Sequence, residues 1–330
     1  MKRRIAKFLA MGTALFGVLV FVHAAIPDRD LQESLDAFEQ ARGSKTVLMG
    51  ASAGSGVDLN IIGFSGAEIW GGGEDIFETV GQARALLASD HEIETWILVL
   101  LPPAQALDNG QAGACCNHRR RERYRLLRAN NDFSLINGDW QTAVASLVPA
   151  GLDDWSPMLD HLGLIEGKAL SRQIALELSR RQSLAQMPSE ASLLREIVTK
   201  QDEIEVLEYR NPDISGQATA ALLSLQRAIA SDGGSLIVIV SPVVAPLPHL
   251  MRQRMPESLQ QFDAMLAALE RNGALVINHW ESWPGASDHR FFRDSVHLNG
   301  EGRTMYSRHL RSDLARNGAI ARDAQNNDLP

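Results

Sequence analysis

A short apolar segment followed by a glycine-rich turn constrains the fold of this chain more than any other stretch. Thr46 to Met49 is apolar enough to be a buried strand, and the chain continues as Gly50-Ala-Ser-Ala-Gly-Ser-Gly56. Small residues let the backbone turn sharply where a strand ends. Ser52 then lies just past the carboxyl end of the strand, where open α/β sheets carry their reactive groups. We therefore expect an α/β fold with its site at this turn.

Glycine-rich turns of this kind serve two different chemistries. In a serine hydrolase the small residues expose Ser52 as the nucleophile and leave backbone N–H groups for an oxyanion. In a dinucleotide-binding domain the glycines bring the backbone close to a pyrophosphate at the start of a helix. Residues from Val57 onwards read instead as extended chain, and none of the three tyrosines has the lysine four residues later that a short-chain dehydrogenase requires. The dehydrogenase interpretation is therefore the weaker one.

Composition narrows the class of partner. The chain has 330 residues, of which 45% are apolar, so it can bury one large core or two modest ones. A net charge of -8 argues against a nucleic-acid binder, because a surface that follows phosphates is normally basic. Cys115 and Cys116 are adjacent, so they do not form a disulfide framework. We identify no zinc ligand set and no cofactor motif, and we expect a small-molecule or carbohydrate substrate.

The N-terminus has the pattern of an export signal. Basic residues between Met1 and Lys7 precede Phe8 to Val22, an apolar run without charge. Residues 1–26 are therefore either a cleaved signal peptide or an uncleaved membrane anchor. In both cases the basic residues stay in the cytoplasm and the chain after Ile26 lies outside it.

Strand and helix patterns alternate along most of the remaining chain. Residues 27–44 have helical spacing and link the N-terminus to a domain spanning residues 45–320, with a polar tail at 321–330. Alternating strands and helices predict right-handed crossovers and a parallel sheet with helices on both faces. The expected strands span residues 46–49, 95–101, 235–240 and 274–278, with residues 58–64 as a further apolar extended run. The expected helices span residues 74–87, 257–271 and 301–315.

The segment 104–232 is too long for a plain crossover, so we interpret it as a helical insertion with helices at 189–209 and 216–230. A run of arginines between residues 119 and 128 has the composition of a surface for an acidic polymer or for lipid headgroups, but a solvated helix face is the commoner outcome. Trp140 and Trp155 could form a sugar platform, although buried packing is more usual for tryptophan.

A second motif supplies partners for a nucleophilic serine. Asp294-Ser-Val-His297 precedes the last expected helix, and a single turn of the loop would point both side chains into one site. His297 could take the proton of Ser52 while Asp294 fixes the imidazole tautomer. His289 and Asp288 are reserve candidates for the same roles. Each residue alone has a structural explanation, as a turn residue, a helix cap or a first-turn histidine, but their combination favours a catalytic site.

At these residues the chain resembles the SGNH, or GDSL-like, hydrolase family, which folds as a three-layer α/β/α sandwich with a central parallel sheet. Gly50-Ala-Ser52 matches the nucleophile block, Phe64-Ser-Gly66 the block whose glycine helps to hold the oxyanion, and Asp294-Ser-Val-His-Leu298 the last block. The resemblance covers residues 45–101 and 235–312. Ala51 stands where hydrolytic members carry aspartate. No Gly-x-Asn-Asp block follows the third strand, so Gln105 or Asn109 would have to replace its asparagine.

With the N-terminal segment, the chain is most similar to the envelope branch of that family, which includes alginate-acetyltransferase-like and D-alanyl-transfer proteins. The resemblance implies a serine acyl-esterase or O-acyltransferase that acts on acyl groups, in the first place acetyl groups, of a cell-envelope or exported polysaccharide. The N–H groups of Ser52 and Gly66 would hold the oxyanion of an acyl-enzyme reaction. It also implies a carbohydrate or acyl-donor partner, a membrane acyl-transfer protein, and a place on the periplasmic side of a bacterial inner membrane or in the secreted fraction. A non-catalytic polymer-binding subunit of the same fold is the alternative.

Overall fold

The computed structural model describes residues 29–111, 114, 116–147 and 190–320. The expected export segment Phe8 to Val22, Cys115, Trp155 and the polar tail lie outside these residues. Within the described ranges, no helix is long and apolar enough to cross a membrane.

Five parallel strands form one sheet in the order β2-β1-β3-β4-β5. Every residue of β1 is buried, and so is every residue of β3 and β4 after the first. Strands covered on both faces are expected to be continuously apolar rather than alternating. The predicted α/β class with a parallel sheet is thus confirmed. The strands are β1 (Thr46–Gly50), β2 (Ala67–Glu68), β3 (Thr95–Leu100), β4 (Ser235–Val240) and β5 (Leu275–Asn278).

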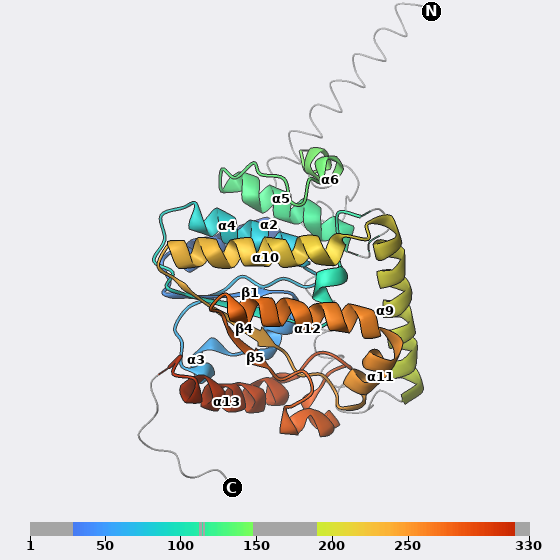
Figure 1. The fold of residues 1–330 in the computed structure, drawn as a ribbon. Helices are drawn as coiled ribbons and strands as arrows, with labels where there is room; N and C mark the ends of the chain where they lie inside the picture. Colours follow the sequence, from blue (N-terminus) through green and yellow to red (C-terminus); the bar gives the residue numbers. More distant parts are fainter. Residues whose placement is uncertain (1–28, 112–113, 115, 148–189, 321–330) are drawn as a thin grey trace, which may run out of the picture.

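Helices cover both faces of the sheet (Figure 1). On one face α10 lies between α4 and α12 and contacts both, and on the other α13 packs against α3. Their bounds are α3 (Leu59–Ile62), α4 (Ile76–Leu87), α10 (Ile214–Ser231), α12 (Pro256–Arg271) and α13 (Gly300–Arg316). An additional helix, α2 (Arg29–Arg42), precedes β1 and contacts α4.

Residues 58–64, predicted to be extended, form a one-turn helix instead. The carboxylate of Asp58 accepts hydrogen bonds from the N–H groups of Asn60 and Ile61, at 3.1 and 3.2 Å, and thereby caps α3. Gly63 ends the helix with a φ of 94°, a conformation that suits glycine. The short edge strand β2 follows, and the sequence patterns did not predict it. The local caps and the packing on α13 outweigh the extended preference of Ile61 and Ile62.

The predicted helical insertion is helical where the structure describes it, but its last helix belongs to the main fold. α10 packs against α4 and β4, as a crossover helix does. α9 (Glu190–Arg210) instead contacts α11 (Pro246–Arg254), which follows β4. The remaining described elements of the insertion are η2 (Ala104–Ala106), α5 (Asn117–Ala129) and α6 (Trp140–Ala145). Trp140 is 68% exposed on α6.

Candidate active site

Ser52 opens a 3₁₀ helix, η1 (Ser52–Gly56), immediately after β1. The small residues of this turn are required by close packing. Gly50 has a φ of 128°, and a Cβ there would overlap the backbone carbonyl of Val99 on the neighbouring strand. A side chain at Gly54 would overlap Trp70. The turn is therefore pressed against β3 on one side and against Trp70 on the other.

The same packing argues against a phosphate cradle. The position of a Cβ on Gly56 lies 3.3 Å from Leu298, and Gly54 is covered by Trp70, so both glycines face side chains of the protein. The backbone after Gly56 is extended at Val57 and Asp58 before α3 begins. A dinucleotide site needs glycine backbone open to the ligand and a helix that starts at the last glycine.

The loop that carries Asp294 and His297 is folded by its own aspartate. Asp294 Oδ1 accepts hydrogen bonds from the backbone N–H groups of Val296 and His297, at 3.0 and 2.8 Å. Ser295, between them, is buried, and its hydroxyl donates to the carboxylate of Glu196 on α9. Its carbonyl accepts from the N–H of Val244, beyond the end of β4, at 3.1 Å. The loop is thus held by its own backbone, by the insertion and by the segment that follows β4.

The structure brings the three predicted catalytic side chains into one hydrogen-bonded chain. His297 Nε2 lies 2.7 Å from Ser52 Oγ, and His297 Nδ1 lies 2.8 Å from Asp294 Oδ2. A proton on Nδ1 satisfies the carboxylate and leaves Nε2 as the acceptor for the Ser52 hydroxyl. The side chain of His297 is 19% exposed and that of Asp294 47%. The arrangement therefore lies at the surface end of the sheet.

Opposing influences act on the charge of Asp294. Partial burial favours the neutral acid, but the hydrogen bond and the charge of His297, with the N–H groups of Val296 and His297, outweigh it. The pKa of Asp294 is consequently lowered, so the carboxylate is ionised at neutral pH. An ionised carboxylate in this place stabilises the imidazolium that forms when His297 takes a proton.

Gly66 does not lie where an oxyanion donor for Ser52 is needed. It precedes Ala67, which pairs with Val47, and a Cβ on Gly66 would overlap the carbonyl of Thr46. Gly66 therefore lies beside the amino end of β1, whereas Ser52 follows the carboxyl end of the same strand. The strand between these two ends is about 13 Å long. The sequence match misplaced the glycine because β2 starts after it.

The loop Gly71–Gly73, beyond β2, lies at the correct end of the sheet. The N–H of Gly71 donates to the carbonyl of Gly50 at 3.1 Å, which ties this loop to the last residue of β1. Open space surrounds the position of a Cβ on Gly72. The carbonyl of Gly73 accepts from Asn109 Nδ2 at 2.8 Å. Gly72 is the residue of this loop whose Cβ position adjoins open space.

The other residues considered for this site have different partners. Gln105 is fully buried and donates to the carbonyl of Ser258 at 2.7 Å. Asn109 donates to Gly73 and Glu78, so neither amide takes the place of the expected asparagine at Ser52. Asp288 pairs with the guanidinium of Arg290, at 2.7 Å. His289 starts the short helix η4 (His289–Phe291), and it is His297 that bonds to Ser52.

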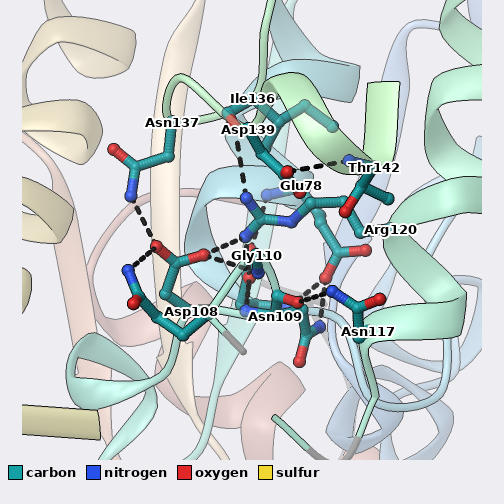
Figure 2. Close-up of polar contacts among 12 residues, drawn as sticks. Glu78, Asp108, Asn109, Gly110, Asn117, Arg120, Ile136, Asn137, Asp139 and Thr142 are labelled. Carbon is teal, nitrogen blue, oxygen red and sulfur yellow. Dashed lines mark hydrogen bonds and ion pairs between the residues drawn. The ribbon is translucent and has the colours of Figure 1, made fainter. Parts of the chain in front are cut away.

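Behind the Gly71–Gly73 loop lies a buried acid–arginine cluster, partly drawn in Figure 2, which the sequence patterns did not predict. Arg120 on α5 is completely buried and forms ion pairs with Asp75 and Asp108. The solvated helix face predicted for the run of arginines is therefore wrong for Arg120. The cluster consists of Glu74, Asp75, Glu78, Asp108, Arg120 and Arg123, with Asn109 joined to it.

Burial is the largest influence on the pKa of both Glu74 and Glu78. It raises the pKa of Glu74 to about 7, although the neighbouring charge of Arg123 and a hydrogen bond from Gln82 act in the other direction. Burial, with the charges of Asp75 and Glu74, also raises the pKa of Glu78 well above its ordinary value. The cluster has four carboxyl groups against two guanidinium groups, and this excess of acids favours the neutral form of Glu78.

The cluster also determines the position of the glycine loop. Glu74 and Arg123 form an ion pair that occupies the space beside Gly71, where a Cβ would overlap both. Asp75 caps α4 and accepts the N–H of Asn109 at 2.6 Å. One local signal was present in the sequence, because Asp75-x-x-Glu78 before an apolar run is the pattern of a capping box. The role of Arg120 has no such local signal.

These contacts define a Ser–His–Asp arrangement at the carboxyl edge of a parallel sheet. Such an arrangement can remove the proton of Ser52 as its oxygen attacks a carbonyl carbon, and can return that proton to a leaving group. A scan of the chain against protein-family models finds no match, and no curated protein matches its sequence.

Proposed function

We propose that this chain is a serine acyl-esterase or O-acyltransferase of the SGNH type, with a three-layer α/β/α sandwich fold. The observation that carries the proposal is the unbroken hydrogen-bonded chain from Asp294 through His297 to Ser52. The parallel sheet and the position of Ser52 directly after β1 support it. So does the place of His297 three residues before α13.

The reaction has two steps. Ser52 Oγ attacks the carbonyl carbon of an ester while His297 Nε2 takes the hydroxyl proton, and a tetrahedral intermediate forms. His297 then donates the proton to the leaving alcohol oxygen, which leaves an acyl group on Ser52. A second hydroxyl, from water or from a sugar, attacks this acyl-enzyme and gives its proton to His297. The acid or the new ester departs, and the proton returns to Ser52.

The negative oxygen of each intermediate needs fixed donors. The N–H of Ser52 opens η1, where the first N–H groups of a helix have no partner within the helix. We assign the second donor to the N–H of Gly72 instead of Gly66, because the Gly71 backbone is bonded to Gly50 and Gly72 adjoins open space. Losing one such donor typically costs about 3 kcal/mol of barrier.

The substrate is an acylated carbohydrate of the cell envelope or an exported polysaccharide, with acetyl as the first acyl group to test. This part of the proposal rests on the export pattern of residues 1–26, on the net charge of -8 and on the resemblance to envelope acyltransferases. A membrane protein that supplies acyl groups, and a site of action outside the cytoplasm or on its membrane, belong to the same proposal.

A fluorophosphonate probe tests the nucleophile directly. The folded, full-length chain should be labelled on Ser52 and should hydrolyse p-nitrophenyl acetate, and Ser52→Ala should lose both properties. Ser55→Ala is the matched control, because Ser55 lies in the same turn but its hydroxyl donates to the carbonyl of Ser52 at 2.7 Å. Hydrolysis that persists in Ser52→Ala contradicts the assignment. A folded wild-type chain that never reacts with the probe supports the non-catalytic, polymer-binding alternative.

A further inference from the structure

A second histidine–carboxylate cluster lies where α13 packs near the end of β5. His279 follows β5, and His309 and Asp313 are four residues apart on α13. His279 Nε2 lies 2.6 Å from Asp313 Oδ2, and His309 Nε2 lies 3.6 Å from the same oxygen. One donor atom from each of the three residues falls within 4.8 Å of the other two. None of them contributes to the chain of bonds that ends on Ser52.

The outer atoms of two of these side chains have partners of their own. His279 Nδ1 lies 3.2 Å from the hydroxyl of Tyr306, which is fully buried. Asp313 Oδ1 is paired with the guanidinium of Arg316. Metal ligands are usually oriented in this way, with the ring nitrogen or carboxylate oxygen that does not bind the metal held by a second group. The inner atoms of His279 and Asp313 are thereby directed toward each other and toward His309.

Distances in the cluster match the dimensions of a small metal site. The imidazole rings of His279 and His309 have centroids 5.0 Å apart and planes inclined by 53°. Two imidazoles on one tetrahedral zinc ion, with bonds of about 2.0–2.1 Å, place their centroids about 5 Å apart. Their ligand atoms are then about 3.3 Å from one another. The separation of His309 and Asp313 is close to this value, and that of His279 and Asp313 must open by about 0.7 Å.

We propose that His279, His309 and Asp313 bind a divalent transition-metal ion, with zinc as the best match. Two imidazoles and one carboxylate are a donor set that zinc accepts, and the ion would replace the proton now shared by His279 and Asp313. The side chain of His309 is 32% exposed, which provides an entry path and room for water as a fourth ligand. The ion would join the end of β5 to the helix whose first turn follows His297.

Metal binding can be measured without any enzymatic assay. The full-length chain, purified in detergent and treated with a chelator, is titrated with zinc in competition with a chromophoric chelator. We expect one ion per chain, and we expect His309→Ala to weaken binding by about 100-fold. His249→Ala is the matched control, since His249 is exposed on α11 outside the cluster, and it should bind as the wild type does. His297→Ala should also retain binding, which separates this site from the Ser52 site.

Cobalt replaces zinc as a spectroscopic probe of the ligands and needs no variant. The wild-type chain should give the absorption of tetrahedral cobalt with nitrogen and oxygen ligands. An added thiolate-to-cobalt band would place the ion on a cysteine and overturn the proposal. Failure to bind zinc at concentrations equal to that of the protein would overturn it, as would equal affinity in His309→Ala and the wild type. Circular dichroism establishes that the His309→Ala chain is folded before its affinity is compared.

Discussion

Two polar clusters flank the Gly71–Gly73 loop: the Ser52 site and the buried acid–arginine cluster. They differ in the exposure and the pairing of their charged side chains. In the Ser52 site the side chains lie on the 3₁₀ helix η1 and on the loop before α13, Asp294 is 47% exposed, and the chain of hydrogen bonds ends on a hydroxyl. In the buried acid–arginine cluster the side chain of Arg120 has no exposure and its charge is matched by two carboxylates. Buried, paired charges hold a backbone in place, whereas a hydrogen-bonded chain that ends on a hydroxyl at the surface leaves that hydroxyl accessible for the proposed reaction. The comparison predicts that substitutions in the first cluster affect rate and those in the second affect stability.

The largest expected effect is on rate. His297→Ala removes the proposed base for the proton of Ser52, so kcat/KM for an acetyl ester should fall by about 10⁴-fold or more. The unfolding free energy should change by no more than about 1 kcal/mol, because the side chain lies at the surface end of the sheet. Steady-state hydrolysis and urea unfolding of the same preparation measure both quantities. A large loss of stability with unchanged rate would reverse the comparison.

Arg120→Met should mainly reduce stability. It leaves the carboxylates of Asp75 and Asp108 buried without their cation, which should lower the unfolding free energy by about 3–5 kcal/mol. Arg119→Met is a matched control one residue away, because Arg119 is 42% exposed and pairs only with Glu122 among the described contacts. That control should cost less than about 1 kcal/mol. Equal urea midpoints for the two variants would show that the buried ion pairs contribute nothing.

Gly72→Pro tests the proposed oxyanion donor, the N–H of Gly72, in the loop between the two clusters. The substitution removes the N–H proposed to hold the oxyanion, so kcat should fall by about 10²–10³-fold. Gly72→Ala keeps the N–H and places its Cβ in open space, so it should retain most of the rate. Thermal unfolding of both variants monitors the loop. Full activity in a folded Gly72→Pro chain would remove Gly72 from the site.

The smallest effect is a change in the pH dependence of stability. The pKa of Glu74 is about 7 in the folded chain, mainly because of burial, against 4.5 in the unfolded chain. The folded state therefore binds more protons between these values, and its stability falls as pH rises, by about 1.4 kcal/mol per pH unit from this group. Glu74→Gln should remove this contribution, which urea unfolding across that range measures. Glu94→Gln, at a side chain that is 68% exposed, should keep the wild-type slope.

The main fold could be predicted because its strands carry strong local signals. β4 has the predicted bounds, Ser235–Val240, since a run buried on both faces is continuously apolar and β-branched. β2 consists of Ala67 and Glu68 alone, which is too short to show a period. The position of an oxyanion donor depends on where the edge strand begins. Because β2 could not be predicted, Gly66 was wrongly predicted to be that donor.

The three residues of the Ser52 site could be proposed because two short motifs each stand next to a predicted strand or helix. The buried cluster could not, because it joins Asp75, Asp108 and Arg120 from three separate segments. An arginine inside a run of arginines has the sequence pattern of a solvated face, and only tertiary packing distinguishes Arg120 from Arg119. The His279–His309–Asp313 cluster could not be predicted for a similar reason. His309 and Asp313 are four residues apart on one helix, but His279 meets them only because α13 packs near the end of β5.

The bond between Ser52 and His297 spans 245 positions of the chain. During synthesis the serine therefore emerges long before its base, and the intervening residues must be made before the two can meet. Contacts of such long range form late, after local helices and hairpins. A growing or truncated chain accordingly carries Ser52 without its hydrogen-bond partner His297. The proposed reactivity toward esters would thus begin only once the segment around His297 has joined the sheet, which would limit premature acylation of an immature chain.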